Sequence, residues 1–370
     1  MALSVTHSTT TAKPNNAAFD VSATAWNATH TLTATNGVMI GASGSTTVGE
    51  ITIGDNLSLA SGVLKVSPLI DPPTGRLTCL SGTPVDTAGI ATARTVVYYT
   101  PYLADVQPVW VAGSSAFVMR RLGELSCDIS NTTNYPISKN FDVFLWDNAG
   151  TTVLATGPSW TSDTARATAI ARLNGLYVNN AAATLRNGAT TYSAGTQTAT
   201  YVGSFRTVAA GSTQFYLGGG ASGGTAAMFG VWNAYNRVFF NSTVTDSGVA
   251  YTYSSNTVRA CRASTTNRVS FISGDYIEAM PTTMVLEYSG ASVASSYFAF
   301  GVGIDSTATF SVRGCGFYNP GTTLTRMAYP WSQNLPSNSG FHFLSANEQA
   351  DGTNNATVQT GTLLSVGLWL

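Results

Sequence analysis

Apolar and polar positions alternate in short runs along much of this chain, most clearly in the stretch ITIGDNLSLASGVLKV at residues 51 to 66. Three alternating apolar pairs are separated there by the turn-like tripeptides GDN and ASG. Alternation predicts strands, and Gly, Asn, Asp and Ser mark the breaks between them. The predicted strands are very short, and an isolated hairpin is at best marginally stable in water. Their apolar positions therefore need a partner surface that this stretch does not supply.

Further β-type runs fill the chain beyond residue 76. Residues 76 to about 240 contain runs such as FDVFLWD and TYVGSFRTV between turn residues, and residues 244 to 370 continue the pattern to the apolar ending LLSVGLWL. Regularly spaced short strands are typical of a sandwich or a barrel. We predict a mainly β protein with two β-sandwich domains, a central one at 76–243 and a C-terminal one at 244–370.

One short helix is expected within the segment SWTSDTARATAIARLNG, at about residues 163–173. Ser162 can cap its N-terminus, and Asp163 suits the positive end of the helix dipole. Arg172 suits the last turn, and Gly175 can end the helix.

The first 75 residues differ from the two predicted domains. Residues 1–50 are rich in Thr, Ala, Ser and Asn with few large apolar side chains, which predicts an extended N-terminal arm. Residues 51–75 hold the short-strand stretch and most of the segment SPLIDPPTGR, whose three prolines and glycine are typical of a linker.

The composition favours an assembled particle. Charged residues make up only 9% of the 370 residues, against ~25% in ordinary globular domains. Low net charge invites association, and the net charge of -1 argues against nucleic acid as a partner. There is no apolar run long enough to span a membrane and no secretory signal. We therefore expect synthesis in a cytosol and no membrane insertion.

The sequence offers little for catalysis. A nucleophilic triad needs a histidine, and two of the three histidines, His7 and His30, lie in the predicted arm. No Gly-x-Ser-x-Gly elbow occurs. The segment GGGASG at 218–223 matches a dinucleotide-binding pattern, but no run of βαβ units surrounds it, so we interpret it as a glycine loop. We expect no catalytic residues and no cofactor.

The cysteines and histidines have no metal-ligand spacing, so no metal site is expected. Four cysteines, none in a Cys-x-x-Cys pair, are interpreted as free core thiols: Cys79, Cys127, Cys261 and Cys315. Glycan cleavage would need two carboxylates on either side of a sugar. The densest acidic group near aromatic residues is Asp275, Glu278 and Glu287. Nothing in the sequence fixes their geometry, so we interpret them as structural hydrogen-bonding residues.

Aromatic residues near the C-terminal end are candidate receptor contacts. The segments RMAYPWSQN and SGFHFLSANEQ place them in polar, loop-like surroundings. Exposed aromatic side chains in loops often stack on sugars or dock on proteins. The candidates are Tyr329, Trp331, Phe341, His342 and Phe343.

Several segments resemble pieces of tailed-bacteriophage and prophage virion proteins of the fibre or spike type. The arm segment FDVSATAWNATHTL resembles their N-terminal "W-N-A-x-H" region, and GDNLSLASGVLKV resembles the short repeat of trimeric viral fibre shafts. The segments FDVFLWDNAGTTVL, WTSDTARATAIARLNGLYV and GVWNAYNRV are similar to a region that recurs in these proteins. The resemblance covers roughly residues 15 to 240, and the remainder resembles only a fibre-tip or jelly-roll-like domain.

The resemblance implies a tail fibre or spike that attaches the virion to the host as a homotrimer. The arm would bind another virion protein, in the tail, baseplate or capsid, and the C-terminal domain would bind a host surface glycan or protein. Three copies of the short shaft strands could then wrap around a common axis and bury their apolar residues against one another. The axis residues would be Ile51, Ile53, Leu57, Leu59, Leu64 and Val66.

Two alternatives remain open. The first is a head fibre or decoration protein that binds the capsid. The second is a tailspike that degrades polysaccharide, with Asp275 and Glu278 as its carboxylates, although the long strand ladder of a β-helix spike is missing.

Overall fold

The computed structural model divides the chain into two compact units, Met1–Leu69 and Ile70–Leu370. In the first unit it describes only the backbone of six strands. In the second unit it describes residues 70–275, 280–289, 296–318, 326–335, 338–359 and 361–370. The side chains of residues 288, 289, 315, 317 and 326–329 are not among those described.

The described strands of the first unit form three antiparallel pairs. They are β1 (Ser4–His7) with β2 (His30–Thr33), β3 (Met39–Ala42) with β4 (Val48–Ile51), and β5 (Leu57–Ala60) with β6 (Val63–Val66). The short strands expected at Leu57–Leu59 and Leu64–Val66 thus form one hairpin. The packing of the proposed axis residues lies outside the described residues, so the shared axis stays a prediction.

The second unit begins with two small sheets and a large one. We call the large one the first sheet, and the three sheets together the first lobe of this unit. The small sheets are β12 (Leu125–Asp128), β9 (Val96–Pro101) and β7 (Gly75–Thr78), and the pair β10 (Val106–Val111) and β11 (Ala116–Arg121). The first sheet has the order β15 (Ile170–Leu173), β16 (Leu176–Asn179), β19 (Thr200–Arg206), β13 (Asn140–Asn148), β14 (Thr151–Ser159), β17 (Ala183–Asn187) and β18 (Thr190–Ala194), with β23 (Val231–Asn233) also on β19.

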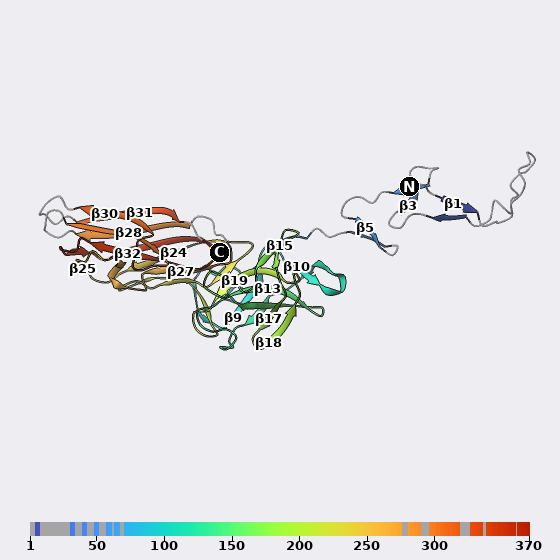
Figure 1. The fold of residues 1–370 in the computed structure, drawn as a ribbon, viewed down its shortest axis with the longest axis horizontal. Helices are drawn as coiled ribbons and strands as arrows, with labels where there is room; N and C mark the ends of the chain where they lie inside the picture. Colours follow the sequence, from blue (N-terminus) through green and yellow to red (C-terminus); the bar gives the residue numbers. More distant parts are fainter. Residues whose placement is uncertain are drawn as a thin grey trace, which may run out of the picture. The chain divides into compact units, whose positions relative to one another are not determined.

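Two further sheets form the second lobe of this unit, drawn largely in orange and red in Figure 1. The second sheet has the order β30 (Val312–Tyr318), β29 (Tyr297–Ile304), β32 (Gly340–Ala350), β27 (Arg268–Ser273), β22 (Ala227–Phe229), β20 (Thr213–Tyr216) and β8 (Ile90–Arg94), with β26 (Arg259–Ala260) on β32. The third has the order β21 (Gly220–Ala221), β24 (Phe239–Asp246), β34 (Thr362–Trp369), β28 (Met280–Ser289), β33 (Ala356–Val358) and β25 (Tyr251–Tyr253), with β31 (Arg326–Leu335) on β28.

The second and third sheets pack face to face as a β-sandwich. Strand β27 of the second sheet contacts β24 and β34 of the third. Alternate residues of β34 are buried, namely Leu364, Val366 and Leu368, and they belong to the same core cluster as Phe271 and Leu344 of the second sheet. This inward alternation is the pattern expected of a sandwich, and the mainly β fold predicted from the sequence is confirmed.

The second sheet recruits strands from distant parts of the chain. Strands β8, β20 and β22 precede residue 243, yet they belong to the same sheet as β27 and β32. Strand β24 also crosses residues 243 and 244, where the sequence predicted a domain boundary. The two lobes therefore share chain segments, and one hydrophobic core cluster extends through both.

The helix predicted at about 163–173 is wrong. The Ser162 hydroxyl does accept hydrogen bonds from the amides of Thr164 and Ala165, at 3.3 and 3.0 Å, but these close a turn that does not continue as a helix. Strand β15 then pairs with β16 through Asn174 and Gly175, whose φ angles are 50° and 84°. Two positive φ angles in an Asn-Gly pair define a two-residue hairpin turn. In the described part of the chain, helical geometry is limited to the 3-10 turns η1 (Ala112–Ser114) and η2 (Cys261–Ala263).

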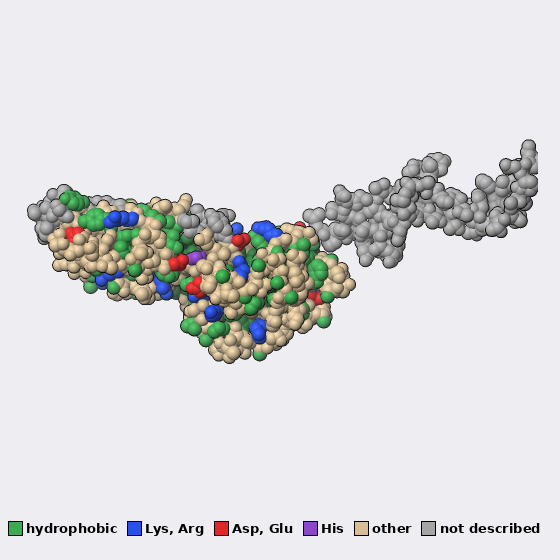
Figure 2. Space-filling view, viewed as in Figure 1, with side chains coloured by type: hydrophobic (Ala, Val, Ile, Leu, Met, Phe, Trp, Pro, Cys, Tyr) green, Lys and Arg blue, Asp and Glu red, His purple; other side chains and the backbone are tan. Residues whose placement is uncertain are grey.

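Charged side chains are sparse on the surface. On the face that Figure 2 shows, they lie as separate spots among uncharged polar and apolar atoms. Within the described residues, no helix has the length and apolar character needed to cross a bilayer.

Candidate functional site

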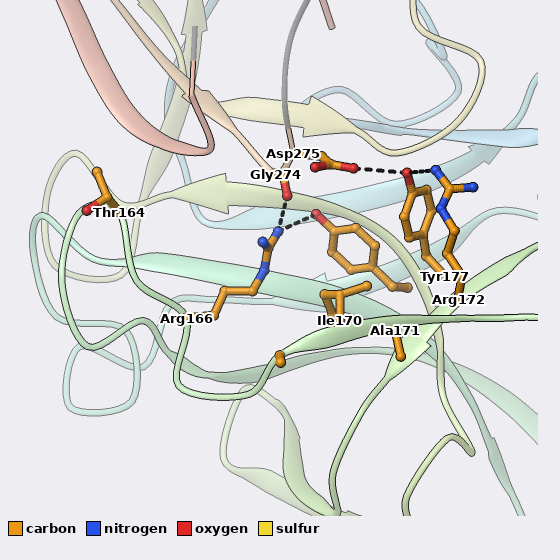
Figure 3. A pocket seen from close by; sticks show the side chains of 10 residues that line it. Thr164, Arg166, Ile170, Ala171, Arg172, Tyr177, Gly274 and Asp275 are labelled. Atoms are coloured by element: carbon orange, nitrogen blue, oxygen red, sulfur yellow. Dashed lines mark hydrogen bonds between the residues drawn. The ribbon is translucent and has the colours of Figure 1, made fainter.

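An open cavity of about 510 Å³ lies where the first sheet meets the end of β27. Its volume falls within the ~300–1,000 Å³ that is usual for ligand pockets. Figure 3 shows its walls, and we call it the Tyr177 cleft. The side chains that define its chemistry are those of Thr164, Arg166, Arg172, Tyr177, Tyr201 and Asp275.

The β15–β16 hairpin supplies one wall of the Tyr177 cleft. Arg172 and Tyr177 are cross-strand partners in this hairpin, and such neighbours interact directly. The Arg172 guanidinium donates a hydrogen bond to the Tyr177 hydroxyl oxygen, and its Cζ lies 4.2 Å from the centre of the Tyr177 ring. The phenol in turn donates a hydrogen bond to Asp275 Oδ2, at 2.9 Å. The three side chains therefore form an arginine–tyrosine–aspartate chain along the cleft (Figure 3).

The Tyr177 phenol remains neutral and donates the hydrogen bond to Asp275. Its partial burial and its hydrogen bond to the Asp275 carboxylate both raise the pKa of the phenol above its usual value. The backbone amide of Tyr177 also donates to the Tyr235 hydroxyl, at 2.7 Å, which fixes the strand beneath the ring.

Arg166 forms the opposite wall and links the two lobes. Its Nε donates to Asp142 Oδ2 at 2.9 Å, and its Nη2 donates to the Tyr201 hydroxyl at 3.2 Å and to the Gly274 carbonyl oxygen. Its Cζ also lies 4.4 Å from the centre of the Trp160 ring. Burial works to lower the pKa of Arg166, but Tyr201 and Asp142 outweigh it, so the pKa is raised. The guanidinium is therefore a fixed positive charge.

Asp142 is a structural anion behind this wall. The residue is only 4% exposed, and its Oδ1 accepts a hydrogen bond from the Ser204 hydroxyl at 2.7 Å. Burial raises its pKa, while the neighbouring Arg166 works in the opposite direction. Both carboxylate oxygens are engaged, so Asp142 holds Arg166 in place and is not one of the residues lining the cleft.

The acidic residues singled out from the sequence separate in space. Asp275 lines the Tyr177 cleft and is exposed, and it is the one carboxylate among the described lining residues. Glu287 lies in β28 of the third sheet, away from this lining. Glu278 lies outside the described residues. The described side chains of this cleft can bind a polar ligand. They offer hydrogen-bonding groups, the guanidinium of Arg172 and the aromatic rings of Tyr177 and Tyr201.

The aromatic residues proposed to contact a receptor lie in strands, not loops. Trp331 is half-buried in β31, and Phe341, His342 and Phe343 are consecutive in β32. Side chains alternate along a strand. Phe341 and Phe343 therefore lie half-buried on the outer face of the second sheet, which is the face that points away from the third sheet, whereas His342 is only 8% exposed. The side chain of Tyr329 lies outside the described residues. None of the other four residues, whose side chains the structure describes, lines the Tyr177 cleft.

Sequence reasoning missed Arg166, Arg172 and Tyr177 as parts of a site. The signal was present in the letters RLNGLY, because an Asn-Gly pair between alternating residues predicts a tight hairpin. That hairpin pairs Arg172 with Tyr177. Interpreting Gly175 as the end of a helix hid this pairing.

No group of three or more metal-binding side chains is found in the described part of the second unit. Three of the four cysteines are confirmed as free core thiols, since Cys79, Cys127 and Cys261 are buried and unbridged. The side chain of Cys315 is not among those described.

Comparison with known proteins gives no identification. No protein-family model matches the chain, and no curated protein matches it. Among solved structures, it is similar to dimeric latent PorU from Porphyromonas gingivalis, with a TM-score of 0.25 and 14% sequence identity. The match covers 57% of this chain and 20% of the PorU chain. A likeness this weak carries no argument about fold or function.

Proposed function

We propose that this chain is a structural protein of a phage or phage-like virion, one subunit of a homotrimeric appendage that attaches the particle to the host cell surface. The Tyr177 cleft carries this proposal. It combines an open cavity with aromatic rings, arginines and a carboxylate that hydrogen bonds hold in place. A few fixed polar groups beside aromatic surfaces are what a polar ligand such as a glycan requires.

Three further observations support attachment. The sequence resembles fibre-like and spike-like virion proteins over roughly residues 15 to 240. The fold is mainly β, and the low charge suits a protein that assembles with its own copies. In a trimer, three weak sites on each appendage would act together and raise the avidity well above that of one site. The N-terminal arm would bind another virion protein, and synthesis would take place in the host cytoplasm.

Adhesion of the purified full chain to bacterial cells tests this proposal. The labelled protein is incubated with a panel of bacterial strains, and bound fluorescence is measured by flow cytometry. We expect strong binding to a subset of strains and several-fold weaker binding by Tyr177→Phe, because this variant keeps the ring but loses the hydrogen bonds to Arg172 and Asp275.

Tyr192→Phe is the matched control. Tyr192 packs against Trp146 in the first sheet, and its hydroxyl has no hydrogen-bond partner among the described residues. We expect this variant to adhere like the unmodified protein. Failure to bind any strain, or equal losses in the two variants, would contradict the proposal.

A polysaccharide-degrading tailspike is the second candidate, because exposed Asp275 faces the cleft. A glycosidase needs a second carboxylate across the sugar, and Glu278 would have to supply it. Incubation with capsular or cell-wall polysaccharide should release reducing sugar if this candidate is correct. No release from polysaccharide of a strain to which the protein adheres would exclude it.

A further inference from the structure

Arg268 carries an uncompensated positive charge on the outer face of the second sheet. It begins β27 and is half-buried, and its Nε is buried without a hydrogen-bond partner. Among the described residues it forms no ion pair, and it packs against the Phe343 ring, whose centre lies 5.3 Å from the guanidinium carbon. Burial alone lowers its pKa, with no carboxylate working against it. A half-buried charge without a partner is costly, so this position is poised to accept an anion.

The guanidinium borders a cavity of about 310 Å³, which we call the Arg268 pocket. The strand register determines which side chains form one wall of this pocket. Ser270 pairs with Phe343 of β32 on one side and with Met228 of β22 on the other, so these side chains share the outer face with Arg268. No aspartate or glutamate is among the described residues that line the pocket.

A second arginine closes the pocket from the first sheet. Arg206, at the end of β19, is 7% exposed, and its guanidinium carbon lies 3.6 Å from the centre of the Phe341 ring. Its Nη1 donates to Asn140 Oδ1 at 2.8 Å and to Asp163 Oδ1 at 2.7 Å. The Asp163 side chain is 55% exposed, and within the described part of the chain its ion pair is with this arginine. The pocket therefore has two guanidinium groups, those of Arg206 and Arg268, and only the Asp163 carboxylate beside them. The net charge of these described groups is positive.

The remaining lining suits a sugar ring. Gln214 and Ser270 offer amide and hydroxyl groups, while Met228 and Phe341 offer apolar surface. Hydroxyls along the edges of a sugar ring and C–H groups on its faces match such a mixture. The volume lies at the lower end of ligand pockets, which fits one sugar unit.

We propose that the Arg268 pocket binds an acidic sugar unit of the host surface, with Arg268 pairing the anionic group and Phe341 and Met228 contacting the ring. Charge-assisted hydrogen bonds from arginine to a carboxylate are strong and directional. This inference rests on the proposed attachment function and adds the chemical class of the ligand. It also gives a role to Phe341, one of the aromatic residues that the sequence singled out.

Binding of sodium glucuronate to the full chain, compared with glucose, tests this proposal by saturation-transfer NMR and titration calorimetry. We expect glucuronate to bind more tightly than glucose and to weaken at high salt. Arg268→Gln should weaken glucuronate binding by about tenfold, since a hydrogen bond to a charged group is lost. Arg121→Gln is the matched control, because Arg121 is 79% exposed on β11 and does not line the pocket.

A second variant tests the pocket independently in case Arg268→Gln does not fold. Gln214→Glu adds a carboxylate to the lining, so it should reduce glucuronate binding by a larger factor than glucose binding, because the added negative charge repels only the anionic sugar. Glucuronate binding no tighter than glucose binding, or equal losses in Arg268→Gln and Arg121→Gln, would overturn the proposal. Inorganic phosphate binding as tightly as glucuronate would indicate a site for free anions and overturn the sugar assignment.

These outcomes separate the inference from the function on which it rests. Adhesion to cells without glucuronate binding would overturn the acidic-sugar site and leave attachment supported. Glucuronate binding that depends on Arg268, without adhesion to any strain, would support the site and contradict attachment.

Discussion

Asp142 and Arg166 form a nearly buried ion pair, with 2.9 Å between Oδ2 and Nε and side-chain exposures of 6% and 17%. The pair does more than neutralise two charges. Arg166 continues to the Gly274 carbonyl oxygen of the second lobe, so Asp142 on β13 indirectly fixes the loop that carries Asp275. The geometry of the Tyr177 cleft therefore depends on an anion that does not line it.

Removing this anion should be costly. We expect Asp142→Asn to lower the free energy of unfolding by about 3 to 5 kcal/mol, because Arg166 is left buried without a counter-charge. Urea titration followed by fluorescence measures the change. Asp105→Asn is the control, since Asp105 pairs with Arg121 at 3.3 Å on the exposed surface, and we expect a change below about 1 kcal/mol. Similar losses in both variants would contradict a structural role for the Asp142 pair.

Gly340 allows β32 to lie directly against the 162–166 turn. A Cβ at this position would come within 2.6 Å of the Asp163 carbonyl oxygen and 2.9 Å of the Thr164 Cα. Its φ of 129° also disfavours other residues. Gly361 has a φ of 98°, but a Cβ added there would have no neighbouring atom within 4 Å, so this position isolates the backbone effect.

We expect Gly340→Ala to destabilise the protein by about 1 to 3 kcal/mol more than Gly361→Ala, because only the first variant overpacks a contact between the lobes. Paired urea titrations measure the difference. Equal destabilisation would mean that this contact tolerates adjustment.

The His342–Asp305 pair should make stability depend on pH. His342 Nδ1 lies 2.7 Å from Asp305 Oδ2. Burial works to lower the pKa of His342, but the hydrogen bond and charge of Asp305 outweigh it, and the pKa is raised above its usual 6.5. Burial works to raise the pKa of Asp305, but His342 and the Phe343 amide outweigh it, and the pKa is lowered.

The sign for each group follows from linkage. The histidine contribution is fully present below pH 6.5 and is lost as the pH rises through the raised pKa. The aspartate contribution is present above its unfolded pKa and is lost as the pH falls through the lowered one. We therefore expect the free energy of unfolding to fall as the pH rises from about 6 to 9, by less than about 1 kcal/mol because Asp305 is 45% exposed. Urea titrations across this range measure the fall. His342→Gln should flatten it, and an unchanged slope would contradict the pairing.

The buried thiols should resist alkylation. Burial raises the pKa of Cys79 and of Cys127 to about 12, and the pKa of Cys261 also lies well above its usual value. Since the thiolate is the reactive form, we expect iodoacetamide at a pH of about 8 to leave these three residues unmodified in the native protein. Peptide mass mapping before and after unfolding in urea reports each cysteine separately. Rapid native labelling of any of the three would contradict its burial.

The alternation of apolar and polar residues predicted the mainly β fold because the period of two is a local property of each strand. It could not predict sheet membership. Strand β8 joins the second sheet beside β20, and β22 lies parallel to β27. Such pairings depend on tertiary packing between distant segments, which leaves no periodic signal in either segment.

The site was predictable only in part. The scarcity of carboxylates drew attention to Asp275, which lines the Tyr177 cleft, but its role there stays a prediction. Arg166 could not be found from its neighbours in the sequence, because its partners Asp142, Tyr201 and Gly274 come from three other segments. Phe341 was chosen as a loop aromatic, yet strand β32 and the guanidinium of Arg206 hold it.

The central claim, that this chain is one subunit of a trimeric virion appendage, is tested most directly by its mass in solution. Light scattering after size exclusion measures the mass of the purified full chain, independently of shape. We predict a mass near three times 38.6 kDa, with the trimer persisting in SDS without boiling. A mass near 38.6 kDa at all concentrations would contradict the trimeric appendage and favour a capsid-bound decoration protein.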